Sequence, residues 1–236
     1  MSHVPFKVHW QLRAPVIVPS LPIHLDALLS WARVQEELER GNVDALALQH
    51  DIPLSRHECR AGWCFMASML EFDYTASQQQ LHFVKTSDID EFAREFERGA
   101  FGRRRPAFDP VRGLTKAGNF VMYEAFAASA TAYGIGDVDH VRDLLSRVHS
   151  IGKLRRCGKG SVRQVDVHPC EEAAQRWAWR NLPFDSPHAA PGSHFAAQQR
   201  LHSPYWSKER HTVLAPAVLP PSMRSVDGKA LSDVVS

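Results

Sequence analysis

"GDVDHVRDLLSRVHSIGKLRRCGKGSV", residues 136–162, joins an amphipathic pattern to a basic loop that contains three glycines. Apolar residues recur at helical spacing from Val138 to Val148, and Asp137 stands where an N-cap side chain is preferred. Gly152 follows this helix and is placed to be its C′ residue with a positive φ. The next stretch, "SVRQVDVHP", reads as a strand that ends at Pro169. We therefore expect helix, loop and strand in that order.

Outside this segment, apolar residues also recur at the spacing of either a helix or a strand. Residues 6–12 alternate as a half-buried strand, and residues 25–40 form an amphipathic helix that Gly41 ends. The remaining expected elements are a β-leaning segment at 62–72 with its strand partner at 79–86, a helix at 87–102, a long strand in the second half of 103–133, and a short helix at 171–183. Helices interleaved with β-pairs indicate an α+β domain with a ferredoxin-like core over residues 1–183. The Pro-, Ser- and His-rich residues 184–236 are expected to be an irregular, partly docked tail.

Composition limits the class of protein. The chain has 236 residues, 44% hydrophobic and 23% charged, which is typical of a soluble globular protein. Its apolar runs stay well short of the about 20 residues of a membrane span, and the first ten residues do not read as a signal peptide. Four cysteines at irregular spacing do not form a secreted disulfide framework. We expect a cytoplasmic protein in a reducing compartment.

The charge distribution is uneven although the net charge is only +2. Residues 101–163 contain twelve Lys or Arg and five Asp or Glu, so this segment carries +7 and the rest of the chain −5. A local basic field in a nearly neutral protein indicates a site for a polyanion.

The glycine-rich loop has the chemistry of a phosphate-binding segment. Glycines allow a sugar-phosphate chain to approach the backbone closely, and exposed N–H groups with nearby cations bind phosphate oxygens. The loop follows a helix C-terminus, whereas a Walker-type loop precedes a helix, so "GKGS" at 158–161 does not predict a nucleotide-hydrolysing site. The expected RNA-binding residues are the loop group Gly152, Lys153, Arg155, Arg156, Gly158, Lys159 and Gly160, and a second group of Arg103, Arg104, Arg105 and Lys116. We expect the two groups to line one groove.

Three stretches together resemble a known family. They are "LDALLSWA" at 25–32, the segment that runs from Tyr133 to Val162, and "RLHSPYW" at 200–206. Their arrangement is similar to the type IV CRISPR-associated RAMP subunit, the five-group protein of the type IV effector, over most of residues 5–210. In that family a G-D-x-x-x-V-x-x-L-L helix is followed by I-G-K and a G-x-G that enters a strand. The family usually has an aromatic residue between these last glycines, where this chain has Lys159.

The resemblance implies a non-enzymatic role in antiviral defence. The protein would bind the 5′ handle of the crRNA, cap the backbone filament of the ribonucleoprotein, and lie beside the large subunit near the PAM-proximal target DNA. It would have a RAMP-type, RRM-like core, and residues 101–120 would form a hairpin thumb. This role suits single-stranded RNA recognition through shape, phosphates and splayed bases. Base pairing would read the target sequence.

Two other functions remain open alternatives. A metal-independent crRNA-processing endoribonuclease would need a base near a 2′-hydroxyl and a cation near the phosphorane, and the candidates are His140, His149, Tyr123 and Lys116. The chain has thirteen histidines, so this coincidence is a weak signal. A protein-only adaptor would not need cations concentrated around glycines.

Other residues favour structural roles. "RHECRAGWC" at 56–64 offers His57, Glu58, Cys59 and Cys64, but four residues separate the two cysteines, where zinc pairs usually have two. We expect buried thiols and no metal or cofactor. The tryptophans in periodic segments are interpreted as core: Trp10, Trp31, Trp63, Trp177 and Trp179. Tyr205 and Trp206 could stack on a base, contact a partner or anchor the tail.

Overall fold

The structure is a computed structural model that describes residues 2–17, 22–75, 79–85, 90, 93–94, 118–189, 192–205 and 207–217. The chain forms two compact units. The smaller one spans residues 79–124, and the larger one contains the rest. Within the smaller unit, β6 (Gln79–Lys85) and β7 (Gly118–Ala125) pair as antiparallel strands from Gln79 opposite Glu124 to Lys85 opposite Gly118. The fold is a mixed α+β fold with antiparallel sheets.

A four-stranded antiparallel sheet is the centre of the larger unit. Its strand order is β5-β8-β1-β9, with β1 at Val4–Leu12, β5 at Glu71–Tyr74, β8 at Ala127–Gly136 and β9 at Val162–Pro169. In β1 the alternation places Phe6, Val8 and Trp10 on one face, where all three are fully buried. Val8 lies opposite both Ala132 of β8 and Val167 of β9, so these three neighbouring strands bury the same face.

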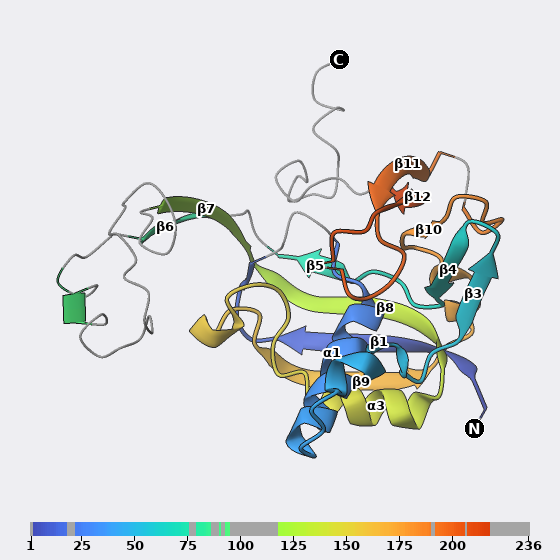
Figure 1. Cartoon of the computed structure of the whole chain (residues 1–236), viewed down its shortest axis with the longest axis horizontal. Helices are drawn as coiled ribbons and strands as arrows, with labels where there is room; N and C mark the ends of the chain where they lie inside the picture. Colours follow the sequence, from blue (N-terminus) through green and yellow to red (C-terminus); the bar gives the residue numbers. More distant parts are fainter. Residues whose placement is uncertain are drawn as a thin grey trace. The chain divides into compact units, whose positions relative to one another are not determined.

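Two helices cover this buried face (Figure 1). They are α1 (Leu25–Glu39) and α3 (Val138–Ser146). Their apolar stripes pack into the core that contains Phe6, Val8 and Trp10; the stripe residues are Leu25, Leu28, Leu29 and Ala32 in α1 and Val141, Leu144 and Leu145 in α3. The chain order β1, α1, β5, β8, α3, β9 is therefore a β-α-β-β-α-β succession on one sheet. In the described part of the chain, no helix is both long enough and apolar enough to span a membrane.

Smaller elements pack around a second apolar core. A three-stranded sheet has the order β10-β12-β11, and β3 pairs with β4 as a hairpin. The bounds of these elements are β10 Leu182–Pro183, β11 His194–Gln199, β12 His211–Pro216, β3 Arg56–Cys59, β4 Gly62–Phe65 and α4 Ala173–Arg176. Cys64, Trp177, Leu182 and Val213 form the buried centre of this region. Three further short elements are β2 (Val16–Ile17), η1 (Ala45–His50) and η3 (Arg155–Cys157).

The structure confirms the strongest periodic predictions. The strand expected at 6–12, the helix expected at 25–40 and the helix–loop–strand order of 136–169 are all present. Asp137 caps α3 by accepting a hydrogen bond from the His140 backbone N–H at 3.0 Å. This bond lowers the pKa of the Asp137 carboxyl because it stabilises the charged form.

Two predictions were wrong. Residues 79–86 do not pair with 62–72, because β6 pairs with β7 and β4 pairs with β3. The chain after residue 184 is not all irregular, since β11 and β12 pair from His194 opposite Pro216 to Gln199 opposite His211. In both cases the choice of partner depends on how strands pack in the folded chain, which the local pattern of each strand does not reveal. The helix expected at 87–102 lies outside the described residues except at 90 and 93–94, as do residues 101–117 of the expected thumb.

Candidate nucleic-acid interface

The basic loop between α3 and β9 is anchored at both ends by backbone hydrogen bonds. The Ile151 N–H donates to the Gly160 carbonyl at 2.8 Å, which closes the loop on itself. The Lys153 N–H donates to the Ile17 carbonyl at 3.0 Å, and the Gly160 N–H donates to the Pro15 carbonyl at 2.7 Å. These bonds hold the loop against the segment that contains β2, so its tip projects from a fixed base.

The three glycines of the loop meet different surroundings, although all have positive φ. A Cβ on Gly160 would lie against the Ile151 carbonyl oxygen, and one on Gly152 would lie 2.7 Å from the Ile17 oxygen. Close packing of the protein's own backbone therefore requires glycine at these two positions. A Cβ built on Gly158 would have no other described atom within 4 Å. The backbone at this position is therefore open to a ligand.

One detail of the Gly152 prediction was wrong. Its φ of 92° is positive as expected, but α3 ends at Ser146 and its C-cap residue is Arg147. Gly152 is therefore not the C′ residue of the helix. Its conformation belongs to the turn that brings the loop onto Ile17.

The cations of the loop differ from those of the preceding helix. Arg142 pairs with Asp139 at 2.5 Å, and Arg147 pairs with Glu39 at 2.6 Å. Lys153, Arg155 and Arg156 are exposed, and no carboxylate in the described part of the chain pairs with them. Lys159 is half-buried. The loop tip thus presents three positive charges that internal ion pairs do not neutralise.

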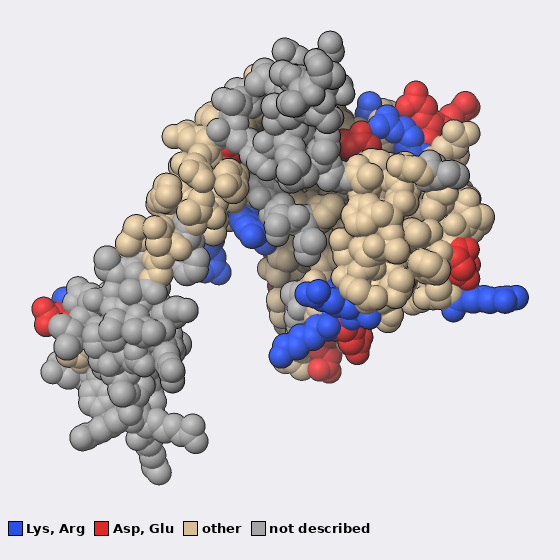
Figure 2. All heavy atoms as spheres, turned by 90° about the horizontal axis from the view of Figure 1, so that it is seen from above, with Lys and Arg blue, Asp and Glu red and all other residues tan. Residues whose placement is uncertain are grey.

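On the side of the molecule shown in Figure 2, the described Lys and Arg side chains lie in separate groups, and acidic side chains stand next to several of them. A confined basic site fits this distribution better than a generally adhesive surface. The second predicted group, Arg103, Arg104, Arg105 and Lys116, lies outside the described residues, so the single groove expected for both groups stays a prediction.

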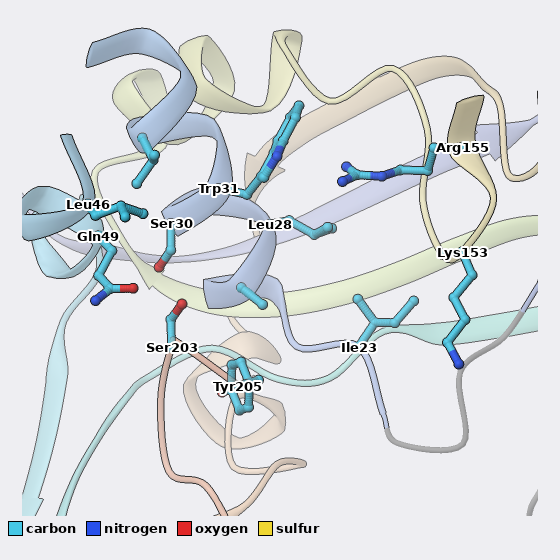
Figure 3. A pocket seen from close by; sticks show the side chains of 13 residues that line it. Ile23, Leu28, Ser30, Trp31, Leu46, Gln49, Lys153, Arg155, Ser203 and Tyr205 are labelled. Atoms are coloured by element: carbon cyan, nitrogen blue, oxygen red, sulfur yellow. The ribbon is translucent and has the colours of Figure 1, made fainter. Parts of the chain in front are cut away.

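A cavity of about 600 Å³ opens beside the loop (Figure 3). Lys153 and Arg155 line it from the loop, and Leu28, Ser30 and Trp31 line it from α1. The Arg155 guanidinium carbon lies 4.7 Å from the centre of the Trp31 ring, which is a cation–π distance. The loop therefore contributes its cations to a recess with an aromatic wall.

A buried polar network supports the opposite wall, which includes Tyr205. The Tyr205 hydroxyl donates to Asp26, with oxygen–oxygen distances of 3.1 and 3.0 Å, and it accepts from Arg180 at 2.9 Å. The Tyr205 ring stacks on His24 with centroids 4.9 Å apart. Burial raises the pKa of Tyr205 well above its ordinary value, because the anion would lose its hydration. Tyr205 is thus held in one position as a neutral phenol.

Arg180 is the centre of this network and is fully buried. It donates to the carbonyls of Phe65, Ala67, Leu201 and Asn181, and it lies 3.4 Å from Asp26. Burial opposes its charge, but Asp26, together with smaller contributions from Tyr205 and Cys64, outweighs that effect and raises the pKa of Arg180. The network fixes residues 201–205 to α1, so the tail is docked at Tyr205; Trp206 lies outside the described residues.

The two candidate histidines of the endoribonuclease alternative lie apart. His140 lies in the first turn of α3 and His149 follows its last turn, so the two imidazoles belong to opposite ends of the helix. Lys116 lies outside the described residues, and Tyr123 belongs to the smaller unit.

The candidate zinc residues lie in the hairpin of β3 and β4. The His57 Nε2 atom lies 3.1 Å from Cys59 Sγ and 3.0 Å from Ser186 Oγ. Cys64 is buried, which raises the pKa of its thiol to about 11, whereas Cys59 is only half-buried. Among the described residues, no three His, Cys, Asp or Glu side chains are grouped so that they could hold a metal ion.

Comparison with known protein families finds a family that matches most of the chain. The family described as CRISPR type IV associated protein Csf3 matches residues 4–216. The chain belongs to the Csf3 family. The match spans the four-stranded sheet, the β10-β12-β11 sheet and the basic loop, and it agrees with the resemblance seen in the sequence. A search of curated proteins finds no significant match.

Sequence reasoning missed the cavity of this Csf3-family chain. Trp31 was interpreted as core, but it is half-buried and lines the cavity, whereas Trp10 and Trp177 are core residues as expected. Ser30 lies off the apolar pattern of α1, so no local signal predicts its burial. No local pattern could have placed Tyr205, which lies 179 residues beyond Asp26.

Proposed function

We propose that this Csf3-family protein binds the 5′ handle of the crRNA and caps the backbone filament of a type IV CRISPR ribonucleoprotein. In this role it contacts the backbone and large subunits and helps to position the PAM-proximal target DNA. It acts without catalysing a reaction. RNA is held through the phosphates and unstacked bases of a single strand.

The observation that carries the proposal is the basic loop of a CRISPR type IV family member. Lys153, Arg155 and Arg156 are exposed and have no carboxylate partner in the described part of the chain. These cations lie beside the open backbone at Gly158. Such an arrangement can bind phosphate oxygens. Lys159 adds a fourth positive charge to the same loop.

The fold supports an RNA-binding role of the RAMP type. The β-α-β-β-α-β succession, with its sheet order β5-β8-β1-β9 and all pairs antiparallel, supports the proposed ferredoxin-like core. In this chain the basic loop enters the edge strand β9, so RNA would lie at one border of the sheet. The separation of His140 from His149 favours holding the RNA over cutting it.

Charge reversal tests the proposal. In the co-expressed type IV effector, the double variant Arg155→Glu, Arg156→Glu should lose crRNA, because two attractive charges become repulsive to phosphate. The matched control is Lys208→Glu, Arg210→Glu, which reverses two exposed cations before β12. Co-purified RNA is quantified by sequencing, and circular dichroism confirms that each variant is folded.

Handle specificity is tested with the purified chain. Affinity for handle RNA and for an unrelated RNA of equal length is measured at several salt concentrations. A specific handle binder keeps its preference as salt rises, whereas a merely basic surface loses affinity for both RNAs together. Retention of crRNA by the double variant, or equal affinity for the two RNAs, contradicts the proposal.

A further inference from the structure

The cavity beside the basic loop has three kinds of surface in spatial order. Figure 3 shows Lys153 and Arg155 at one end and the side chains of Ser30, Gln49 and Ser203 toward the other. Apolar and aromatic side chains lie between these ends, among them Ile23, Leu28 and Trp31. A nucleotide has the same order of groups, since an anionic phosphate is joined through a sugar to a flat base with a polar edge.

Ser30 contributes a buried hydroxyl to the cavity. Its side chain is 2% exposed and its Oγ atom has no hydrogen-bond partner among the described residues. The Ser30 hydroxyl points into the cavity toward Ser203 (Figure 3). A buried hydroxyl without a partner costs free energy, and a ligand that supplies the partner recovers it. A hydroxyl can donate to a base carbonyl or accept from a base amino group.

Arg155 is held at the cationic end. Its guanidinium lies over the Trp31 ring at a cation–π distance, and its backbone opens η3, which follows Leu154 with a φ of 55°. Planar guanidinium groups bind phosphate oxygens through paired N–H donors, and a cation–π contact uses none of these donors in a hydrogen bond. The Trp31 contact therefore directs Arg155 without using its hydrogen-bonding capacity.

We infer that this cavity holds one unstacked nucleotide of the bound RNA. Its base enters toward Ser30, Gln49 and Ser203, and its phosphate lies between Lys153 and Arg155. This inference rests on the proposed function, because it names the subsite through which the handle is distinguished from other RNA. The cavity volume of about 600 Å³ is within the range of small-ligand sites. Apolar contacts around the inserted base offset the free-energy cost of unstacking it.

An abasic scan of the handle tests the subsite. Each handle nucleotide is replaced in turn by an abasic one, and affinity for the full chain is measured by fluorescence anisotropy. One position should lose about tenfold in affinity, which is the contribution of a single well-packed base. The other positions should change little.

Two variants connect that position to the cavity. Ala27 is half-buried and lines the cavity, so Ala27→Leu fills the space the base needs and should abolish the effect of the abasic position. The matched control, Ala174→Leu, adds the same atoms to an exposed site in α4. Ser30→Ala removes only the unpartnered hydroxyl and should reduce discrimination among the four bases there. Its melting temperature should not fall, which keeps the test valid if Ala27→Leu does not fold.

The possible outcomes separate this inference from the proposed function. If wild-type protein does not prefer handle RNA, the proposed function fails. If it prefers the handle but no single abasic position matters, or Ser30→Ala keeps full base discrimination, only the subsite is overturned. If Ala27→Leu binds RNA normally but no longer joins the backbone subunit, the cavity takes a peptide, and the inference is wrong.

Discussion

Arg155 lines the cavity, whereas Arg180 lies in the buried network that holds the cavity residue Tyr205, and the two arginines have opposite surroundings. Arg180 is fully buried, and its donors reach four backbone carbonyls, the Tyr205 hydroxyl and Asp26. Arg155 is exposed, contacts the Trp31 ring, and has no carboxylate partner in the described part of the chain. The same side chain therefore stabilises the fold in one place and remains available for a ligand in the other.

This difference shows that the location of an arginine carries more information than its presence. A buried guanidinium must have all its donors satisfied internally, because an unpaired buried charge is very costly. An exposed guanidinium pays no such penalty and can exchange water for phosphate. Substitutions on the Arg180 side should lower stability, and substitutions on the Arg155 side should change RNA affinity.

The largest expected effect follows from removing the partner of Arg180. Asp26→Ala leaves a fully buried cation without its carboxylate, so the free energy of unfolding should fall by about 3 to 5 kcal/mol. Urea denaturation followed by tryptophan fluorescence measures the change. The control is Asp139→Ala, which removes the exposed partner of Arg142 and should cost less than about 1 kcal/mol. If both variants lose the same free energy of unfolding, burial is not the reason why Arg180 and Arg155 differ.

The next effect distinguishes the base of the basic loop from its tip. Gly160→Ala places a Cβ against the Ile151 carbonyl oxygen at a φ of 61°, and it should lower the free energy of unfolding by at least about 2 kcal/mol. Gly158→Ala adds a Cβ in open space at a φ of 77°, so only about 1 kcal/mol of backbone strain is expected. Thermal melts of both variants measure this ranking, and a reversed order would contradict the packing account of Gly160.

A smaller effect concerns pH on the Arg180 side. Burial lowers the pKa of His24 well below 6.5, and repulsion from Arg180 adds to this shift. Below about pH 6.5 the unfolded chain therefore binds a proton at His24 that the folded chain does not bind. Stability should fall as the pH drops, by at most about 1.4 kcal/mol per pH unit from this residue.

His24→Phe isolates this contribution. Unfolding free energies of wild type and variant are compared from about pH 7 down to about pH 5. The variant should have the flatter dependence, because its aromatic ring can pack against Tyr205 without titrating. If the free energies of unfolding of the two proteins fall in parallel with pH, His24 is not a neutral buried group in the folded chain.

The smallest effect on stability is expected at Arg155. Arg155→Gln removes one exposed cation and its contact with Trp31, so unfolding should change by less than about 1 kcal/mol. The slope of log affinity for handle RNA against log salt should become shallower by about 0.7, the value of one phosphate contact on a single strand. Arg142→Gln, which removes a cation already paired with Asp139, should leave the slope unchanged. Equal slopes for wild type and Arg155→Gln would exclude Arg155 from the phosphate contacts.

Hydrophobic periodicity predicted the strands and helices whose buried residues recur at a regular spacing. Phe6, Val8 and Trp10 alternate in β1, and α3 has an apolar stripe with a cap at Asp137. The pairing of β6 with β7 and the strands at 194–216 were not predicted. Strand pairing is decided by contacts between distant segments, and such contacts leave no local period.

By itself, the sequence determined the succession of helices and strands in the core, the excess of cations between residues 101 and 163, and the resemblance that the Csf3 family match confirmed. These properties depend on residue types at short spacing. Only the tertiary structure decided that Gly152 and Gly160 serve backbone packing while Gly158 faces open space. It alone brought Ser30, Arg155 and Tyr205 to one cavity, because a cavity is formed where segments distant in sequence fold against one another.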